Sequence, residues 1–202
     1  MKPSTVILAA GDFPRKGGMA WALLASAKRV VACDSAADAY RRRFRKWPTV
    51  IIGDLDSFSR PNLFPVPRSL IPVSDQETND LEKAINYCAK QGWRDPVIVG
   101  ATGKREDHTI GNVFRALAYG CETVTDRGRF IPVRGKAVLK VKKGTAVSIF
   151  APDPKTRMTS SGLQWPLEGV RFRNLYCATL NRATATRVTL TASRLVSVYI
   201  EI

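Results

Sequence analysis

The chain has 202 residues, of which 45% are hydrophobic and 24% are charged, so it can bury a proper core and disorder is not expected. No stretch approaches the roughly 20 apolar residues that cross a bilayer, and the N-terminal residues lead into a short apolar run typical of a strand; we therefore expect a cytoplasmic protein with no membrane partner. The formal net charge of +15 predicts a surface that attracts anions, whether nucleic acid, acidic lipid or small polyphosphates.

The first part of the chain alternates short apolar runs with amphipathic stretches. Continuous β-rich runs predict strands at 6–10, 30–33, 50–52 and 97–99, as in a parallel sheet that is covered on both faces. Apolar residues at i, i+3, i+4 and i+7 predict helices through 81–88 and 110–117. Four prolines between positions 61 and 72 indicate an irregular crossover before a segment at 69–73.

After about Gly120 the helical period disappears and short β-rich pieces follow, separated by turns. They lie at 122–125, 130–133, 137–141, 146–150, 170–172, 188–191 and 195–200. The sequence therefore predicts two classes of structure, α/β and all-β: a Rossmann-like α/β domain with a mainly parallel sheet over residues 1–127, then a small antiparallel β-sandwich over 128–202. Because about 75 residues are few for independent stability, we expect the second domain to pack on a neighbour.

The most concentrated basic run is 41–47, where Phe44 and Trp47 are interleaved with arginine and lysine. Such a run could bind nucleic acid, but a solvated helix end whose two aromatic residues face the core is the favoured interpretation. The cysteines are scattered without C-x-x-C spacing, and His108 is the only histidine, so buried free thiols are expected in place of a zinc site.

Polar residues follow three of the predicted strands, at Asp34, at Asp54 and at 100–103. Because the carboxyl ends of parallel strands form the ligand crevice of an open sheet, these residues should gather at one edge. Asp54 and Asp56 lie two apart, and a hard cation such as Mg²⁺ would relieve the repulsion between them. A turn in which aspartate caps backbone amides explains this pair equally well when it is considered alone.

A second polar segment, 74–81, directly precedes the first clear helix. Thr78 or Asn79 is a suitable N-cap, and Asp80 suits the positive end of the helix dipole. Beside Asp54 and Asp56, Asp80 also becomes a candidate third carboxylate for the metal.

A third segment, 100–112, is a glycine-containing loop that leads from a strand into a helix. Free amides at the helix start, together with Lys104 and Arg105, would form a phosphate cradle, although the spacing of a P-loop is absent. Asp107 could be the helix N-cap with His108 as its partner. His108 and Asn112 are four residues apart and face the same way, which favours a functional role.

These three segments, in this order, resemble the thiamin pyrophosphokinases, which transfer a pyrophosphate group from ATP to the hydroxyl of thiamin. The resemblance lies in G-D-L-D-S at 53–57, D-Q-E-T-N-D-L-E-K-A at 75–84 and the loop at 100–112. It extends to 10–14, 33–36 and the S-S-G-L-Q-W-P-L run at 160–167, and so covers essentially the whole chain.

The resemblance implies an α/β catalytic domain that binds nucleotide and metal, followed by a β-sandwich that binds thiamin. It also implies a homodimer in which thiamin lies between the catalytic domain of one subunit and the sandwich of the other. ATP and thiamin are the expected partners and Mg²⁺ the expected cofactor.

The implied site residues fall into four groups. Asp54, Asp56 and Asp80 would hold Mg²⁺, and these three with Arg105 and Asp107 are the expected catalytic residues. The nucleotide and its phosphates would be met by Asp34, Gln76, Thr78, Thr102, Gly103, Lys104, Arg105, His108 and Asn112. Thiamin would be met by Ser161, Gly162, Trp165, Thr179 and Asn181.

Trp165 would pack flat on the cationic thiamin rings, unless it is a core residue of the sandwich. Two positions depart from the family pattern: Ser35 replaces a glycine, and Leu180 replaces a serine beside Asn181. A pyrophosphokinase acting on another alcohol, such as a hydroxymethylpterin, is the nearest alternative, and Leu180 keeps it open. A basic nucleic-acid-binding protein is a more distant one, since the acidic cluster would repel phosphates without a metal.

Overall fold

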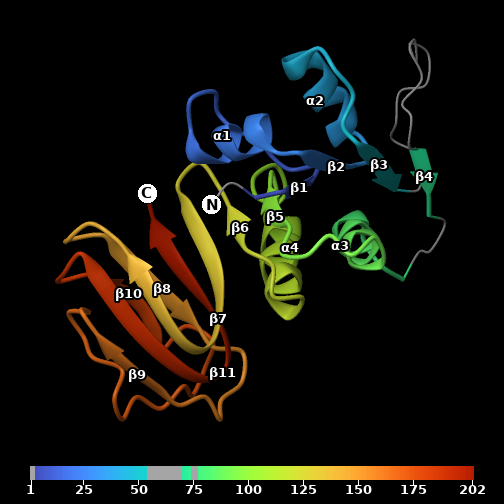
Figure 1. Cartoon of the computed structure of the whole chain (residues 1–202). Helices are drawn as coiled ribbons and strands as arrows, with labels where there is room; N and C mark the ends of the chain where they lie inside the picture. The colour runs from blue at the N-terminus through green and yellow to red at the C-terminus, as the bar shows by residue number, and fades with distance from the viewer. Residues whose placement is uncertain (1–2, 54–69, 74–76) are drawn as a thin grey trace. The chain divides into compact units, whose positions relative to one another are not determined.

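The computed structural model describes residues 3–53, 70–73 and 77–202, and the chain divides into two compact units, Met1–Asp126 and Arg127–Ile202 (Figure 1). The first unit is α/β with a parallel sheet, and the second is built from antiparallel strands. The predicted fold class is confirmed. Within the described residues, no helix has the length and apolar character needed to span a membrane.

The sheet of the first unit is parallel in every described pair and has the order β6-β5-β1-β2-β3-β4. Its strands are β1 (Thr5–Leu8), β2 (Arg29–Cys33), β3 (Val50–Gly53), β4 (Leu70–Pro72), β5 (Val97–Val99) and β6 (Thr123–Val124). The winding direction reverses between β1 and β5, which is the place where open α/β sheets bind ligands. The β-rich piece at 122–125, which lies within the predicted α/β domain at 1–127, contains β6 and pairs in parallel with β5.

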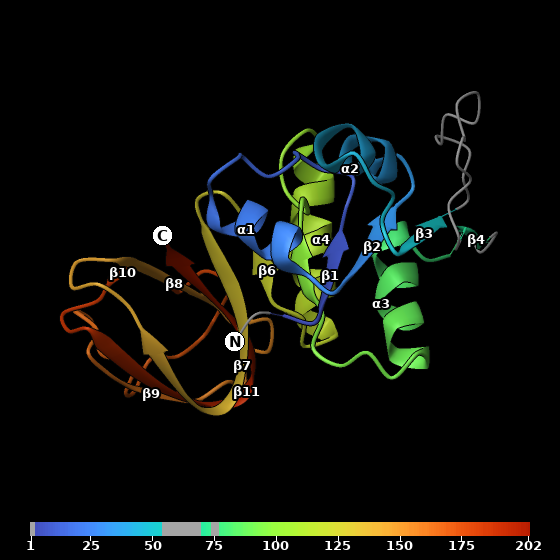
Figure 2. The same cartoon turned by 45° about the horizontal axis from the view of Figure 1, so that its top comes forward.

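Helices cover both faces of this sheet because alternate strand residues point to opposite sides. Val6 and Leu8 face a core formed with α1 (Met19–Ser26) and α2 (Ala36–Phe44). Ile7 faces a second core formed with α3 (Asp80–Lys90) and α4 (Glu106–Ala118). Figure 2 shows the two helix pairs on different sides of the strands.

The second unit contains β7 (Gly128–Lys140), β8 (Ala146–Phe150), β9 (Met158–Ser161), β10 (Ala178–Arg182) and β11 (Arg187–Glu201). The long strand β11 pairs with β7 along most of its length, with β9 in its first half and with β8 in its second half. The strand is irregular between Ala192 and Val196, and one apolar core is enclosed by these strands.

Three predictions in this unit are corrected. The pieces at 130–133 and 137–141 are one strand, as are 188–191 and 195–200, because each long partner stabilises the other across the irregularity. The piece at 170–172 is a loop whose Phe172 is buried. Strands β9 and β10 were not predicted, since their mostly polar residues carry little apolar signal.

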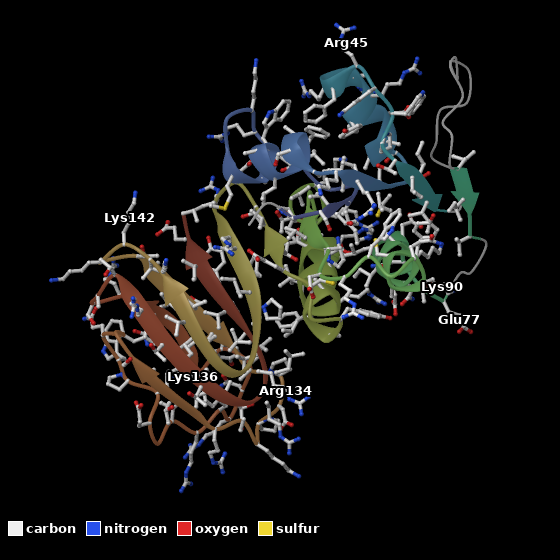
Figure 3. The ribbon with its side chains drawn as sticks, in the orientation of Figure 1. Arg45, Glu77, Lys90, Arg134, Lys136 and Lys142 are labelled. Atoms are coloured by element: carbon white, nitrogen blue, oxygen red, sulfur yellow. The ribbon has the colours of Figure 1, made fainter. Side chains whose placement is uncertain are left out.

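The basic run at 41–47 is the end of α2, which stops at Phe44 with Arg45 in the left-handed conformation. Phe44 and Trp47 pack against the core, and the Arg41 guanidinium lies 4.5 Å from the centre of the Trp47 ring. The run is thus a helix end, as favoured above, and Arg45 points to solvent (Figure 3). Of the four cysteines, three are buried, but Cys177 is exposed, which corrects the expectation for that thiol.

Candidate active site

The loops after β1 and β5 lie against each other at the reversal point of the sheet. The amide of Gly11 donates to the carbonyl of Gly100 at 2.7 Å, and the amide of Asp12 donates to Thr102 O at 2.8 Å. A Cβ atom on Gly11 would lie 2.4 Å from Thr102 O, so only glycine allows this close approach. The position of the 100–105 loop is therefore fixed by the loop that follows β1.

The 100–105 loop holds its own cationic residue in place. Lys104 Nζ donates to Ala10 O at 2.7 Å, and Lys104 has a φ of +57°. The amide of Gly103 donates to Thr109 Oγ1 at 3.1 Å. Gly103 and Lys104 are exposed, whereas Thr102 is partly buried. An exposed ammonium above a tight backbone turn is suited to an anionic group.

The start of α4 differs from the alternative in which Asp107 is the N-cap of the helix. Arg105 occupies the N-cap position, and Asp107 lies in the first turn. Asp107 instead accepts two bonds from the Arg105 guanidinium, at 3.1 Å and 2.6 Å. This pairing lowers the pKa of Asp107 and raises the pKa of Arg105. Both side chains are largely exposed, and so is His108.

Two of the predicted carboxylates converge at the end of β3. A Cβ atom placed on Gly53 would lie 3.1 Å from Asp34 Cβ and 3.4 Å from Asp80 Oδ1. Asp34 is buried, with 5% of its surface exposed, while the Asp80 side chain is 32% exposed. Asp34, one of the strand-end residues expected to gather at this edge, thus lies close to Asp80, the candidate third carboxylate. Asp54, Asp56 and Gln76 lie outside the described residues.

Lys83 was not among the predicted site residues, yet it is a buried cation within this cluster. Its Nζ lies 3.2 Å from Asp80 Oδ1, and only 7% of the residue is exposed. The signal in the sequence was its position three residues after Asp80 in a helix, which places both on one face. A buried lysine requires such a partner.

The thiol of Cys33 lies beneath the same cluster, with Sγ 3.5 Å from Asp80 O. Burial raises the pKa of Cys33 well above its ordinary value, and the neighbouring Asp80, Cys88 and Asp34 raise it further. Lys83 acts in the opposite direction. The thiol is therefore neutral and serves the cluster as packing, not as a nucleophile.

Asn112 connects the acidic cluster to the 100–105 loop. Its Oδ1 accepts from Asn79 Nδ2 at 3.3 Å, and its own Nδ2 donates to Ala101 O at 3.1 Å. Asn79 is the N-cap of α3 and accepts from the amide of Glu82 at 3.0 Å, as the sequence predicted for Thr78 or Asn79. The Asn112 side chain is thereby occupied in holding the two loops together.

In the second unit, Trp165 is 55% exposed, so the alternative that it is a core residue is wrong. Its backbone is held by the buried side chain of Asn181, whose Oδ1 accepts from Trp165 N at 3.2 Å and whose Nδ2 donates to Trp165 O at 2.7 Å. Asn181 therefore positions Trp165. Thr179 Oγ1 donates to the carbonyl of Tyr176 at 3.0 Å, and its hydroxyl is likewise used within the fold.

The remaining predicted residues of this unit lie at the end of β9. Ser161 is exposed, and Gly162 adopts a φ of +82° where a Cβ would lie 2.4 Å from Arg187 O. Leu180 is 85% exposed with a φ of +62°; nothing in the structure explains why leucine stands there.

Mg²⁺ prefers oxygen ligands such as carboxylates, so the acidic side chains of the cluster are its candidate ligands. Within the described ranges, no group of three or more His, Cys, Asp or Glu side chains is placed to hold a metal. Asp34 and Asp80 supply two carboxylates there, and G-D-L-D-S begins at the glycine between them.

Two models of one protein family match the chain, one in each unit. The family model "Thiamin pyrophosphokinase, catalytic domain" matches residues 20–124, more than half of the chain, and "Thiamin pyrophosphokinase, substrate-binding domain" matches residues 128–199. The chain belongs to the thiamin pyrophosphokinase family. The resemblance inferred from the motifs is thereby confirmed.

Individual members of the thiamin pyrophosphokinase family are distant in sequence. Thiamin pyrophosphokinase 1 of Caenorhabditis elegans is 29% identical over 101 residues, which are 46% of this chain and 41% of that protein; the match thus spans about two fifths of that relative's length.

Solved structures of the family share the fold. The Bacillus subtilis thiamine pyrophosphokinase has 17% identity and a TM-score of 0.73, with 98% of each chain covered. The yeast enzyme has 14% identity and a TM-score of 0.76, covering 100% of this chain and 86% of that one. The Geobacillus thermodenitrificans protein has 20% identity and a TM-score of 0.76, covering 98% and 96%.

Proposed function

We propose that this chain transfers a pyrophosphate group from ATP to the hydroxyl of thiamin, giving thiamin diphosphate and AMP. The observation that carries the proposal is the convergence of Asp34 and Asp80 around Gly53, where the G-D-L-D-S segment begins. Membership of the family supports the identity of both substrates.

We propose that Asp54, Asp56 and Asp80 hold Mg²⁺. The charges of the cluster support this assignment, because the Lys83 ammonium lies beside Asp80 and Asp34 adds a second carboxylate nearby. Adding Asp54 and Asp56 increases the negative charge, and a divalent cation would balance it. When bound, Mg²⁺ would neutralise part of the charge on the phosphate groups.

The proposed nucleotide side of the site is the 100–105 loop with the start of α4. Lys104 uses one donor on Ala10 O and keeps further N–H groups for phosphate oxygens. Arg105 is held by Asp107, which restricts its guanidinium before a ligand arrives. Gln76, Thr78, Thr102, Gly103 and His108 would complete the contacts to the nucleotide, with Asn112 positioning the loop.

In the proposed reaction, the thiamin hydroxyl oxygen forms a bond to the β-phosphorus of ATP. The bond from that phosphorus to the oxygen bridging to the α-phosphate breaks, and AMP leaves. The hydroxyl proton passes to a base, for which the carboxylates of the cluster are the candidates. Lys104 and Arg105 would stabilise the charge that develops on the transferred group.

On the thiamin side, we propose that Trp165 stacks its exposed ring on the cationic thiazolium. Ser161, Gly162 and Thr179 would border the substrate, while Asn181 acts through Trp165.

We further propose a homodimer, which light scattering at several protein concentrations would test. A monomer at all concentrations would contradict it.

The function is tested by incubating the purified chain with ATP, Mg²⁺ and thiamin and measuring AMP and thiamin diphosphate. Asp54→Asn should nearly abolish turnover while the circular dichroism spectrum stays unchanged. Asp95→Asn is the matched control, because Asp95 is exposed and precedes β5 at the end of the strand opposite the proposed site. Turnover of a hydroxymethylpterin without turnover of thiamin would refute the proposed substrate.

A further inference from the structure

The positive charge of the chain is concentrated in the second unit. Residues 127–202 contain 14 Lys and Arg but only 3 Asp and Glu, a net charge of +11 out of the total of +15. Lysines and arginines of β7 and of the turn after it, Arg134, Lys136 and Lys142, are labelled in Figure 3. None of the functions proposed above uses this excess.

A pocket of about 390 Å³ lies within this unit, and three of its five lining residues are arginines. Pro154 and Arg157 come from the connection between β8 and β9, and Arg171, Phe172 and Arg173 come from the loop before β10. The volume falls within the usual range for small-molecule sites, roughly 300–1,000 Å³. All three arginines are exposed, and none forms an ion pair with a residue in the described part of the chain.

The walls of the pocket are held by buried groups. Phe172, with 1% exposure, anchors its loop in the core, and a tight turn from Arg173 N to Arg171 O, at 2.8 Å, brings the chain around it. The arginines on both sides of Phe172 therefore line the same pocket. Because the backbone of this loop is already held in place, little conformational entropy would be lost in ordering it when an anion binds.

The opposite wall is equally fixed. Arg157 N donates to Ser193 Oγ at 2.9 Å, and Arg157 O accepts from the amide of Ser193 at 2.9 Å. Asp153, the acidic residue next to Pro154, is directed to Arg194 at 3.6 Å and to the amide of Lys155 at 2.7 Å. Glu168, three residues before Arg171, accepts from the amide of Ser160 at 2.8 Å. Both carboxylates that are close in sequence to the arginines thus have other partners.

We propose that this pocket binds a small polyphosphate, meaning an anion with two or more linked phosphate groups. Guanidinium groups form paired hydrogen bonds with phosphate oxygens, and three of them match an anion of several charges. Nucleic acid is disfavoured because single-strand sites offer aromatic faces for stacking, whereas the aromatic ring of this pocket is buried. The inference goes beyond the proposed transfer reaction and does not depend on it.

The test is calorimetric titration of the whole chain with inorganic tripolyphosphate in EDTA, which removes divalent cations. We expect saturable binding that the double variant R171Q/R173Q weakens at least tenfold, since charge-assisted bonds are lost. The control R134Q/K136Q removes the same charge from β7 in the same unit and should bind as the wild type does. Melting curves of both variants establish that the fold is intact.

Equal affinity in R171Q/R173Q and in the wild type would overturn the proposal, as would the same weakening in both double variants. Displacement of tripolyphosphate by a single-stranded oligonucleotide that binds more tightly would overturn it in favour of nucleic acid. Asp80→Asn separates this site from the proposed active site: it should reduce turnover but leave tripolyphosphate binding in EDTA unchanged.

Discussion

The hydrogen bonds of Asn181 lead to a quantitative prediction for Asn181→Ala. The side chain is 5% exposed and makes three bonds, two with the backbone of Trp165 and one from the amide of Arg182 at 2.8 Å. Each such bond contributes about 1 kcal/mol net. The substitution should therefore lower the free energy of unfolding by about 2–3 kcal/mol, a large share of the stability of a small domain.

Urea denaturation followed by circular dichroism measures this loss. Asn174→Ala is the matched control, because Asn174 lies in the preceding loop, is exposed and makes only local bonds; its effect should stay within about 0.5 kcal/mol. A change of less than 0.5 kcal/mol in Asn181→Ala would refute the inference that this side chain is a structural clamp.

The role of Asn181 can also be tested through the KM for thiamin. If Asn181 acts only through Trp165, Asn181→Ala should raise the KM for thiamin in the wild type but not in a Trp165→Ala background. An equal increase in both backgrounds would mean that Asn181 contacts the substrate directly. The double-mutant cycle thus separates positioning from contact.

Three further predictions concern stability. Leu180→Asn should raise the free energy of unfolding by about 0.5–1 kcal/mol in urea titrations, because asparagine tolerates the left-handed backbone of this exposed position better than leucine; a loss would mean that Leu180 makes a stabilising contact. Gly162→Ala should lower the free energy of unfolding by at least about 2 kcal/mol, since the added Cβ would overlap Arg187 O. Gly111 lies inside α4 with open space around it, so Gly111→Ala should raise the same free energy by about 0.5–1 kcal/mol. Similar changes in the two variants would contradict this explanation. Burial raises the pKa of Cys88 from 9.0 to about 12 and that of Cys121 from 9.0 to about 11, so thiols that ionise only in the unfolded chain should lower stability as pH rises above 9. Melting temperatures between pH 8 and 11 should fall less steeply in the Cys88→Ala/Cys121→Ala variant, and parallel slopes would argue against the shift.

The helices α3 and α4 could be predicted because their apolar residues follow a strict helical spacing. Helix α1 could not, because Met19–Ser26 contains apolar or small residues on every side and shows no polar face. In the second unit, Phe172 misled the prediction, because a single buried side chain that anchors a loop looks like part of a strand.

For the site, the position of Asp34 at the end of a strand and that of Asp80 at the start of a helix could be predicted, because strand ends and helix starts are local features. The clamp formed by Asn181 and the contact between Gly162 and Arg187 O depend on which strands lie side by side. That information is absent from local patterns. Lys83 lies between these cases, since its spacing from Asp80 was visible but its burial was not.

The bonds of Asn112 to Asn79 and to Ala101 O have a consequence for how this enzyme family can be varied. One amide ties the start of α3 to the loop after β5, so a substitution at either end changes the support of the other. Variants that reshape the nucleotide side should therefore show epistasis with variants at the acidic cluster. Libraries designed around the two loops separately would miss combinations that succeed only when position 112 changes with them.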